Sequence, residues 1–79
     1  MDSFKAIKSG ENKYYSQKHG EIHIHRSKKD NFEYLWSEKE KFISNLFPLD
    51  INRYSIPNYN GHSYLVMIDD IFLNVELIE

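Results

Sequence analysis

The segment from Asp30 to Pro48 carries its large apolar residues at helical spacing. At about 100° per residue, these side chains fall within an arc of about 140°. They are Phe32, Leu35, Trp36, Phe42, Ile43, Leu46 and Phe47. Asp30 suits the N-cap position with Glu33 three residues later, and Pro48 ends the run. The pattern therefore predicts an amphipathic helix.

An alternative interpretation divides the same segment. Phe32, Tyr34 and Trp36 alternate as they would in a strand, and a helix then begins at Ser37. Ser37 and Glu40 have the spacing of a capping box, which favours that start. Both interpretations place a helix before Pro48.

The C-terminal third predicts a β-hairpin around Asp69-Asp70. With these residues as a two-residue turn, one continuous apolar face forms and must be core. This face holds Tyr64, Val66, Ile68, Ile71, Leu73, Val75 and Leu77. The other face carries Leu65, Met67 and Phe72, which is more apolar than a solvated surface requires, so we expect a helix or a partner to cover it. A loop one residue longer would exchange the two faces.

A second hairpin is predicted around His19-Gly20, because glycine supplies the positive φ that a tight turn needs. Pairing Lys18 with Glu21 gives an inward face and a polar outward face. The inward residues are Tyr15, Ile22 and Ile24, and the outward residues are Tyr14, Ser16, Lys18, Glu21, His23 and His25. We expect further strands in the first ten residues, as a short edge strand, and at 51–56, followed by a turn at 57–61.

These elements predict a single α+β domain over residues 1–79. Its order is roughly β-β-α-β-β-β, an antiparallel sheet of four to five strands with one amphipathic helix packed on one face. The opposite face of the sheet is then left for solvent or a partner.

Composition narrows the class of protein. The chain has 79 residues and no cysteine, which excludes disulfides, thiolate metal sites and cysteine nucleophiles. Its longest apolar run is 64–68, too short for a membrane helix, and the N-terminus lacks the pattern of a secretion signal. We therefore expect a cytoplasmic protein, and its small size favours binding over catalysis. No residue pattern calls for a cofactor.

Charge is unevenly divided along the chain. Residues 1–29 have a net charge of +4, whereas residues 30–79 have a net charge of −6. If the basic part forms one surface, it mixes cations with an aromatic ring, a combination that suits nucleic acid. The residues of this alternative function are Lys13, Tyr14, Lys18, Arg26, Lys28 and Lys29.

The histidines suggest another alternative, a metal-binding protein. His23 and His25 are two residues apart, so on a strand both imidazoles project from one face, with Glu21 or His62 as a third ligand. The competing interpretation is that His19, His23 and His25 belong to the polar side of a half-buried hairpin.

The preferred hypothesis is a small non-enzymatic module that binds another protein. Its surface would be Leu65, Met67 and Phe72, or the loop with Tyr59, with charged residues at the rim. The size and composition are typical of inhibitors, antitoxins and immunity-type proteins of phages or mobile elements, which act by occluding a partner's surface. A homodimer through the same face is a variant that would also enlarge the small core.

Overall fold

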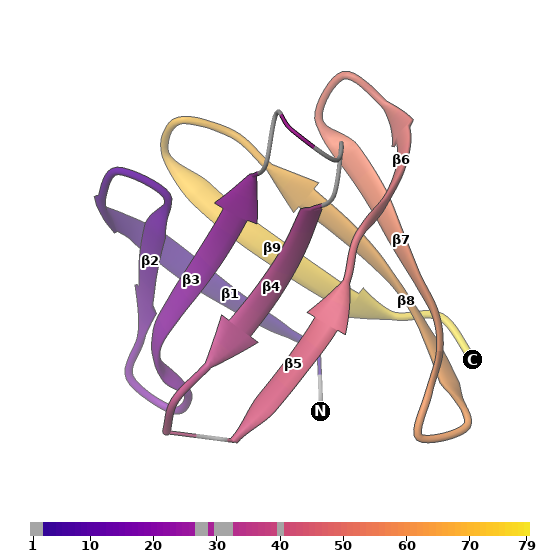
Figure 1. The fold of residues 1–79 in the computed structure, drawn as a ribbon. Coiled ribbons are helices and arrows are strands. Elements are labelled where there is room, and N and C mark those ends of the chain that lie inside the picture. Colours follow the sequence, from indigo (N-terminus) through magenta and orange to yellow (C-terminus); the bar gives the residue numbers. More distant parts are fainter. Residues whose placement is uncertain (1–2, 27–28, 30–32, 40) are drawn as a thin grey trace.

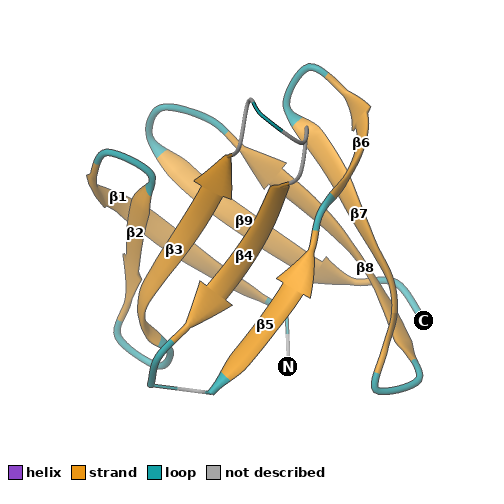
Figure 2. Ribbon diagram, viewed as in Figure 1, coloured by secondary structure: helices purple, strands orange, loops and turns teal. Residues whose placement is uncertain are grey.

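The protein folds as one antiparallel sheet that curls almost into a barrel (Figures 1 and 2). The computed structural model describes residues 3–26, 29, 33–39 and 41–79, and every regular element in them is a strand. The strands are β1 (Phe4–Gly10), β2 (Lys13–Ser16), β3 (Gly20–Arg26), β4 (Glu33–Ser37), β5 (Phe42–Asn45), β6 (Phe47–Asp50), β7 (Arg53–Tyr59), β8 (His62–Ile68) and β9 (Phe72–Leu77). The described ranges contain no helix long and apolar enough to cross a bilayer.

The strand order explains the closure. It is β5-β4-β3-β2-β1-β9-β8-β7-β6, so two consecutive meanders are joined where β1 pairs with β9. The terminal strands β5 and β6 are separated only by Leu46, whose N–H donates to the carbonyl of Glu33 at 2.9 Å. One stretch of chain thus pairs first with β4 and then with β7, which brings the two edges of the sheet together (Figure 1).

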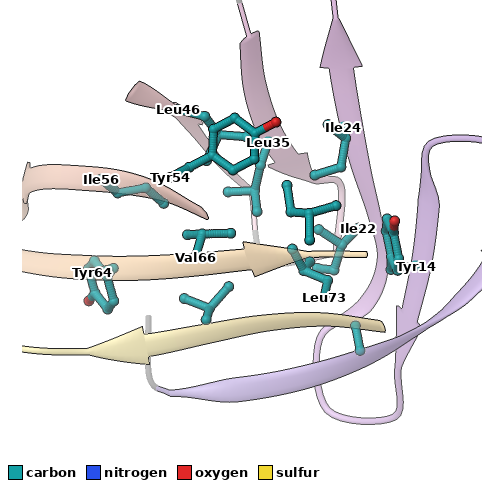
Figure 3. Close-up of a cluster of buried hydrophobic side chains, with 13 residues drawn as sticks. Tyr14, Ile22, Ile24, Leu35, Leu46, Tyr54, Ile56, Tyr64, Val66 and Leu73 are labelled. Atoms are coloured by element: carbon teal, nitrogen blue, oxygen red, sulfur yellow. The ribbon is translucent and has the colours of Figure 1, made fainter. Parts of the chain in front are cut away.

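Alternate residues of the strands fill the interior (Figure 3). The buried apolar side chains are Ala6, Tyr14, Ile22, Ile24, Leu35, Leu46, Tyr54, Ile56, Tyr64, Val66, Ile68, Leu73 and Val75. Burial of each large aliphatic side chain contributes about 1.5–3 kcal/mol, so this cluster is the main source of stability. The residues between them point outward.

The predicted α+β class is wrong, because β4 and β5 take the place of the helix. Leu35 and Trp36, neighbours on the predicted helical arc, lie on opposite sides of β4: Leu35 is fully buried and Trp36 is outward. Aromatic residues favour strands, and β4 gains cross-strand pairs on both sides, from β3 and from β5. Pro48 lies on the terminal strand β6, where a missing N–H is tolerated.

The alternative interpretation of this segment was half right. A strand does cover Glu33–Ser37, but the helix from Ser37 is wrong, because residues 42–45 form β5. The predicted N-cap Asp30, the residue Phe32 and the capping-box residue Glu40 lie outside the described residues.

The C-terminal hairpin is confirmed in its faces but not in its register. Ile68 lies opposite Leu73 and Val66 opposite Val75, two positions away from the predicted pairing. The shift arises because Asp69 extends the loop, its carboxylate accepting hydrogen bonds from the N–H groups of Ile71 and Phe72 at 2.7 and 2.8 Å. An even shift keeps the faces, but two residues of the predicted inward face are exposed: Ile71 at the turn and Leu77 at the end of β9.

The predicted faces of the first hairpin are wrong at Tyr14, Tyr15 and Ser16. Tyr14 lies opposite Ile22 and is buried, whereas Tyr15 lies opposite Glu21 and is 53% exposed. Ser16, which was predicted to be outward, is also buried. A turn of three residues, 17–19, replaces the predicted two-residue turn, so β2 is shifted by three residues relative to β3. Because this shift is odd, the side chains of β2 exchange faces. Ile22 and Ile24 are inward, as predicted.

Two smaller predictions also change. The strand at the N-terminus, β1, is not an edge strand, because it pairs with β2 and β9. The strand predicted at 51–56 begins later and includes Pro57, so the turn is reduced to Asn60 and Gly61, both with positive φ.

Candidate functional site

Two groups of outward side chains on the barrel differ from an ordinary solvated surface. The first, which we call the apolar face, lies on β1, β8 and β9 and on the loop before β9. It consists of Ile7, Leu65, Met67, Ile71 and Phe72. The second, which we call the stacked face, lies on β3 and β4 and consists of His23, His25, Tyr34 and Trp36.

The apolar face is held together by strand register. Ile7 lies directly opposite Phe72, and Leu65 and Met67 occupy successive outward positions of β8. Ile7, Met67 and Ile71 are 66%, 40% and 68% exposed, and Leu65 and Phe72 are half-buried. Leu65, Met67 and Phe72 therefore all lie on the outside of the barrel, where no helix of the described chain covers them. They do not form one unbroken patch, because Asn74 lies opposite Met67 and Glu76 lies opposite Leu65.

Charged groups surround the apolar face. The ammonium group of Lys5 lies 4.1 Å from the centre of the Phe72 ring, and Lys8 lies 3.8 Å from the carboxylate of Asp70. Arg53, which pairs with Met67 across the strands, donates two hydrogen bonds to Asp50. These bonds lower the pKa of the Asp50 carboxyl and raise the pKa of the Arg53 guanidinium. A rim of this kind is typical of protein interfaces.

Tyr59 is placed apart from the apolar face. It ends β7 beside the hairpin turn, whereas Met67 is at the open end of the β7–β8 hairpin. Its ring is half-buried, packs on the core and lies 6.4 Å from the Tyr64 ring in an edge-on arrangement. It also lines an open hollow of about 380 Å³ with Ser44, Asn45, Phe47, Pro57 and Asn58. Tyr59 therefore belongs to the seam between β5 and β7.

The stacked face is formed by two cross-strand ring pairs. The rings of His23 and Trp36 are 4.1 Å apart and inclined by 10°, and those of His25 and Tyr34 are 4.6 Å apart and inclined by 21°. Both pairs follow from the register of β3 and β4, which places these residues directly opposite each other. Neither Tyr34 nor Trp36 was assigned to a site from the sequence, because both were placed in the predicted helix, although their alternation was the signal for a strand.

Ionic groups continue the row of His23 and Trp36. Lys13 on β2 lies opposite His23, and its ammonium group is 3.6 Å from the Glu21 carboxylate. The same carboxylate is 3.9 Å from Nε2 of His23. Beside them is an open hollow of about 400 Å³, lined by Glu21, His23, Glu38, Lys39 and Lys41.

The residues predicted for nucleic-acid binding are not all on one surface. Lys13 is outward and beside the stacked face, but Tyr14 lies inside the barrel and its hydroxyl donates to the carbonyl of Asp69 at 2.8 Å. Lys18 is in the turn before β3, Arg26 ends β3, and Lys29 is exposed beyond it. Lys28 lies outside the described residues.

The predicted metal ligands share a face without forming a metal centre. His23 and His25 both point outward from β3, as expected, but each ring is stacked on an aromatic side chain. Within the described ranges, no group of three His, Cys, Asp or Glu side chains is arranged to hold a metal ion. His62 is on β8, separated from β3 in the sheet by three strands, and His19 is buried with its ring 4.2 Å from Phe4.

Comparison of the chain with models of protein families gives no match, and comparisons with curated proteins and with solved structures give none either. The function is therefore argued from the two faces alone.

Proposed function

We propose that this protein is a small, non-enzymatic module that binds another protein through its apolar face. The proposal is carried by one observation: outward positions of β1, β8 and β9 hold Ile7, Leu65, Met67 and Phe72, where an alternating strand normally presents polar residues to solvent. Exposed apolar side chains that are grouped on one side of a protein and bordered by charge are a mark of interaction sites.

The geometry suits occlusion of a partner's surface. The β8–β9 hairpin is fixed by pairing on both sides, with β7 and with β1, so the side chains of the apolar face are held in place before binding. A preorganised surface loses less conformational entropy on association. Met67 and Phe72 supply adaptable and aromatic contact area, and the ions of Lys5, Asp50 and Arg53 would select among partners.

The proposal is tested with two substitutions that each introduce a glutamate, on different faces. Leu65→Glu places a charge within the apolar face, and His25→Glu places one at an exposed outward position of β3, which three strands separate from β8 in the sheet. We expect the unmodified protein to form a complex, with a protein of its source cell or with a second copy of itself. Leu65→Glu should abolish this complex and His25→Glu should preserve it.

Chemical cross-linking followed by mass spectrometry identifies the partner, and sedimentation velocity detects self-association. Circular dichroism must show that both variants keep the β-sheet spectrum. If Leu65→Glu folds and forms the same complex with unchanged affinity, the apolar face is not the binding surface and the proposal is wrong.

A further inference from the structure

The stacked face is a second candidate surface, and it is independent of the apolar face. It places two imidazole–aromatic stacks in successive outward rows of β3 and β4. Positions two residues apart on a strand are about 7 Å apart, so the two stacks are close neighbours. The core does not require aromatic rings at outward positions. Two successive outward positions of β3 and the two opposite positions of β4 nevertheless carry rings, so these four rings form an aromatic surface.

The second row is the more exposed of the two. Strand β2 begins at Lys13, which pairs with His23. The turn before it continues beside β3 as far as Ile24, whose N–H donates to the carbonyl of Asn12 at 2.9 Å, and the exposed Glu11 precedes Asn12 in this turn. The imidazole of His25 is exposed, so a flat ring from solvent can stack on it beside Tyr34.

Lysine side chains lie at both ends of this surface. Lys29 is exposed in the connection between β3 and β4, near the end that carries His25 and Tyr34. Lys39 and Lys41 are exposed in the connection between β4 and β5, and they line the hollow beside His23. Lys13 adds a further cation, although Glu21 and Glu38 offset part of the charge.

We propose that the stacked face binds single-stranded nucleic acid. A base would stack on the exposed ring of His25 in the His25–Tyr34 pair, next to the His23–Trp36 pair, while the phosphates contact Lys29, Lys39 and Lys41. Flat rings between cations match a chain in which flat bases alternate with anionic phosphates, and base stacking does not depend on sequence. A duplex hides the faces of its bases, so the same surface has much less to offer it.

The nucleic-acid surface would thus lie on β3 and β4 and the connections after them, rather than on the N-terminal hairpin expected from the sequence. Four lysines (Lys13, Lys29, Lys39 and Lys41) against three described acidic residues (Glu11, Glu21 and Glu38) give a small positive excess, so stacking must supply much of the binding energy. The expected affinity is consequently modest, with a Kd of about 10⁻⁴ to 10⁻⁶ M at moderate salt.

The experiment titrates the full chain with an oligodeoxyuridylate and an oligouridylate of about eight nucleotides each, which differ only in the 2′-hydroxyl group. Trp36 is the single tryptophan of the chain, so a base stacked beside it should change its fluorescence. We expect binding of one or both oligonucleotides, a change in Trp36 emission, and an affinity that falls as salt increases. Preference for one of the two distinguishes RNA from DNA as the ligand.

Two variants separate stacking from charge. His25→Ala should weaken binding about fivefold or more, because stacking of a base is lost. Lys41→Gln should weaken binding and reduce its salt dependence. Lys5→Gln, which removes a cation from the apolar face, is the matched control and should bind like the unmodified protein.

Three results would overturn the proposal. The first is no binding of either oligonucleotide at about 1 mM in low salt. The second is equal affinity for a duplex of the same length, which would indicate charge attraction alone. The third is unchanged binding by a folded His25→Ala variant. Each can occur whether or not the apolar face binds a protein.

Discussion

At the scale of single residues, the Asp69 carboxylate decides how the C-terminal hairpin is paired. It accepts the N–H groups of Ile71 and Phe72 and so closes a loop longer than two residues. The sequence was sufficient to predict the hairpin and its buried face, because shifting the pairing of the two strands by an even number of residues leaves the same side chains facing inward. It could not give the register, because Asp69-Asp70 is compatible with several loop lengths and only hydrogen bonding in the folded chain selects among them.

The Asp69 turn predicts a pH dependence of stability. Hydrogen bonds from the N–H groups of Phe72 and Ile71 lower the pKa of the Asp69 carboxyl in the folded protein. Because the folded pKa lies below the unfolded value of about 3.9, the stabilisation is complete above that value and is lost as pH falls through the folded pKa. We expect Asp69→Asn to have a lower Tm than the unmodified protein near neutral pH and a smaller difference in strong acid.

Calorimetry between about pH 7 and about pH 2 measures this difference. Asp70→Asn is the control, because the Asp70 carboxylate accepts neither of the two N–H bonds and is paired with Lys8. A Tm difference for Asp69→Asn that stays constant over the whole range would contradict the assigned role of the carboxylate.

The two neighbouring tyrosines test which side of β2 faces inward. Tyr14 is buried and its hydroxyl donates to the Asp69 carbonyl, whereas Tyr15 is outward. Tyr14→Phe should lower the free energy of unfolding by about 0.5–1.5 kcal/mol, because one buried hydrogen bond is lost. Tyr15→Phe should have almost no effect. Urea denaturation measures both, and a larger cost for Tyr15→Phe would support the face assignment made from the sequence alone.

At the scale of elements, the segment around β4 and β5 shows where sequence periodicity misleads. Leu35, Trp36 and Leu46 fit a helical arc, yet Leu35 and Leu46 are inward and Trp36 is outward in the sheet. A short stretch rich in aromatic residues fits both the helical period of about 3.6 residues and the strand period of two residues. Pairing of β4 with β3 and β5 selects the strand. Those pairings join consecutive strands, and the spacing of apolar residues in the segment did not reveal them.

Leu35 and Phe47 separate the strand from the helix experimentally. Both would be core residues of the predicted helix, but in the sheet Leu35 is fully buried and Phe47 is 51% exposed. Leu35→Ala should cost about 2–5 kcal/mol of unfolding free energy, as other buried leucines do. Phe47→Ala should cost less than about 1 kcal/mol.

The same urea titration compares the two variants, with unchanged denaturant slopes as the sign that only stability has changed. Similar large losses for both substitutions would mean that Phe47 is also interior, which the strand arrangement does not allow.

At the scale of the whole molecule, closure of the sheet creates the two faces. Pairing of β1 with β9 unites the two meanders, and the bend at Leu46 brings β5 and β6 together, so all inward side chains share one core (Figure 3). The apolar face was accessible from the sequence because it lies mostly within one hairpin. The stacked face was not, because it exists only when β3 and β4 pair, and the sequence pattern assigned these two segments to different kinds of element.

The most direct test of this account is an NMR experiment that records nuclear Overhauser effects between protons of neighbouring strands. The arrangement predicts cross-strand contacts between Ala6 and Leu73, where the meanders join, and between the rings of His23 and Trp36, where the stacked face forms. Strong sequential amide contacts from residue 33 to residue 47, without contacts between His23 and Trp36, would indicate a helix in place of β4 and β5 and would contradict it.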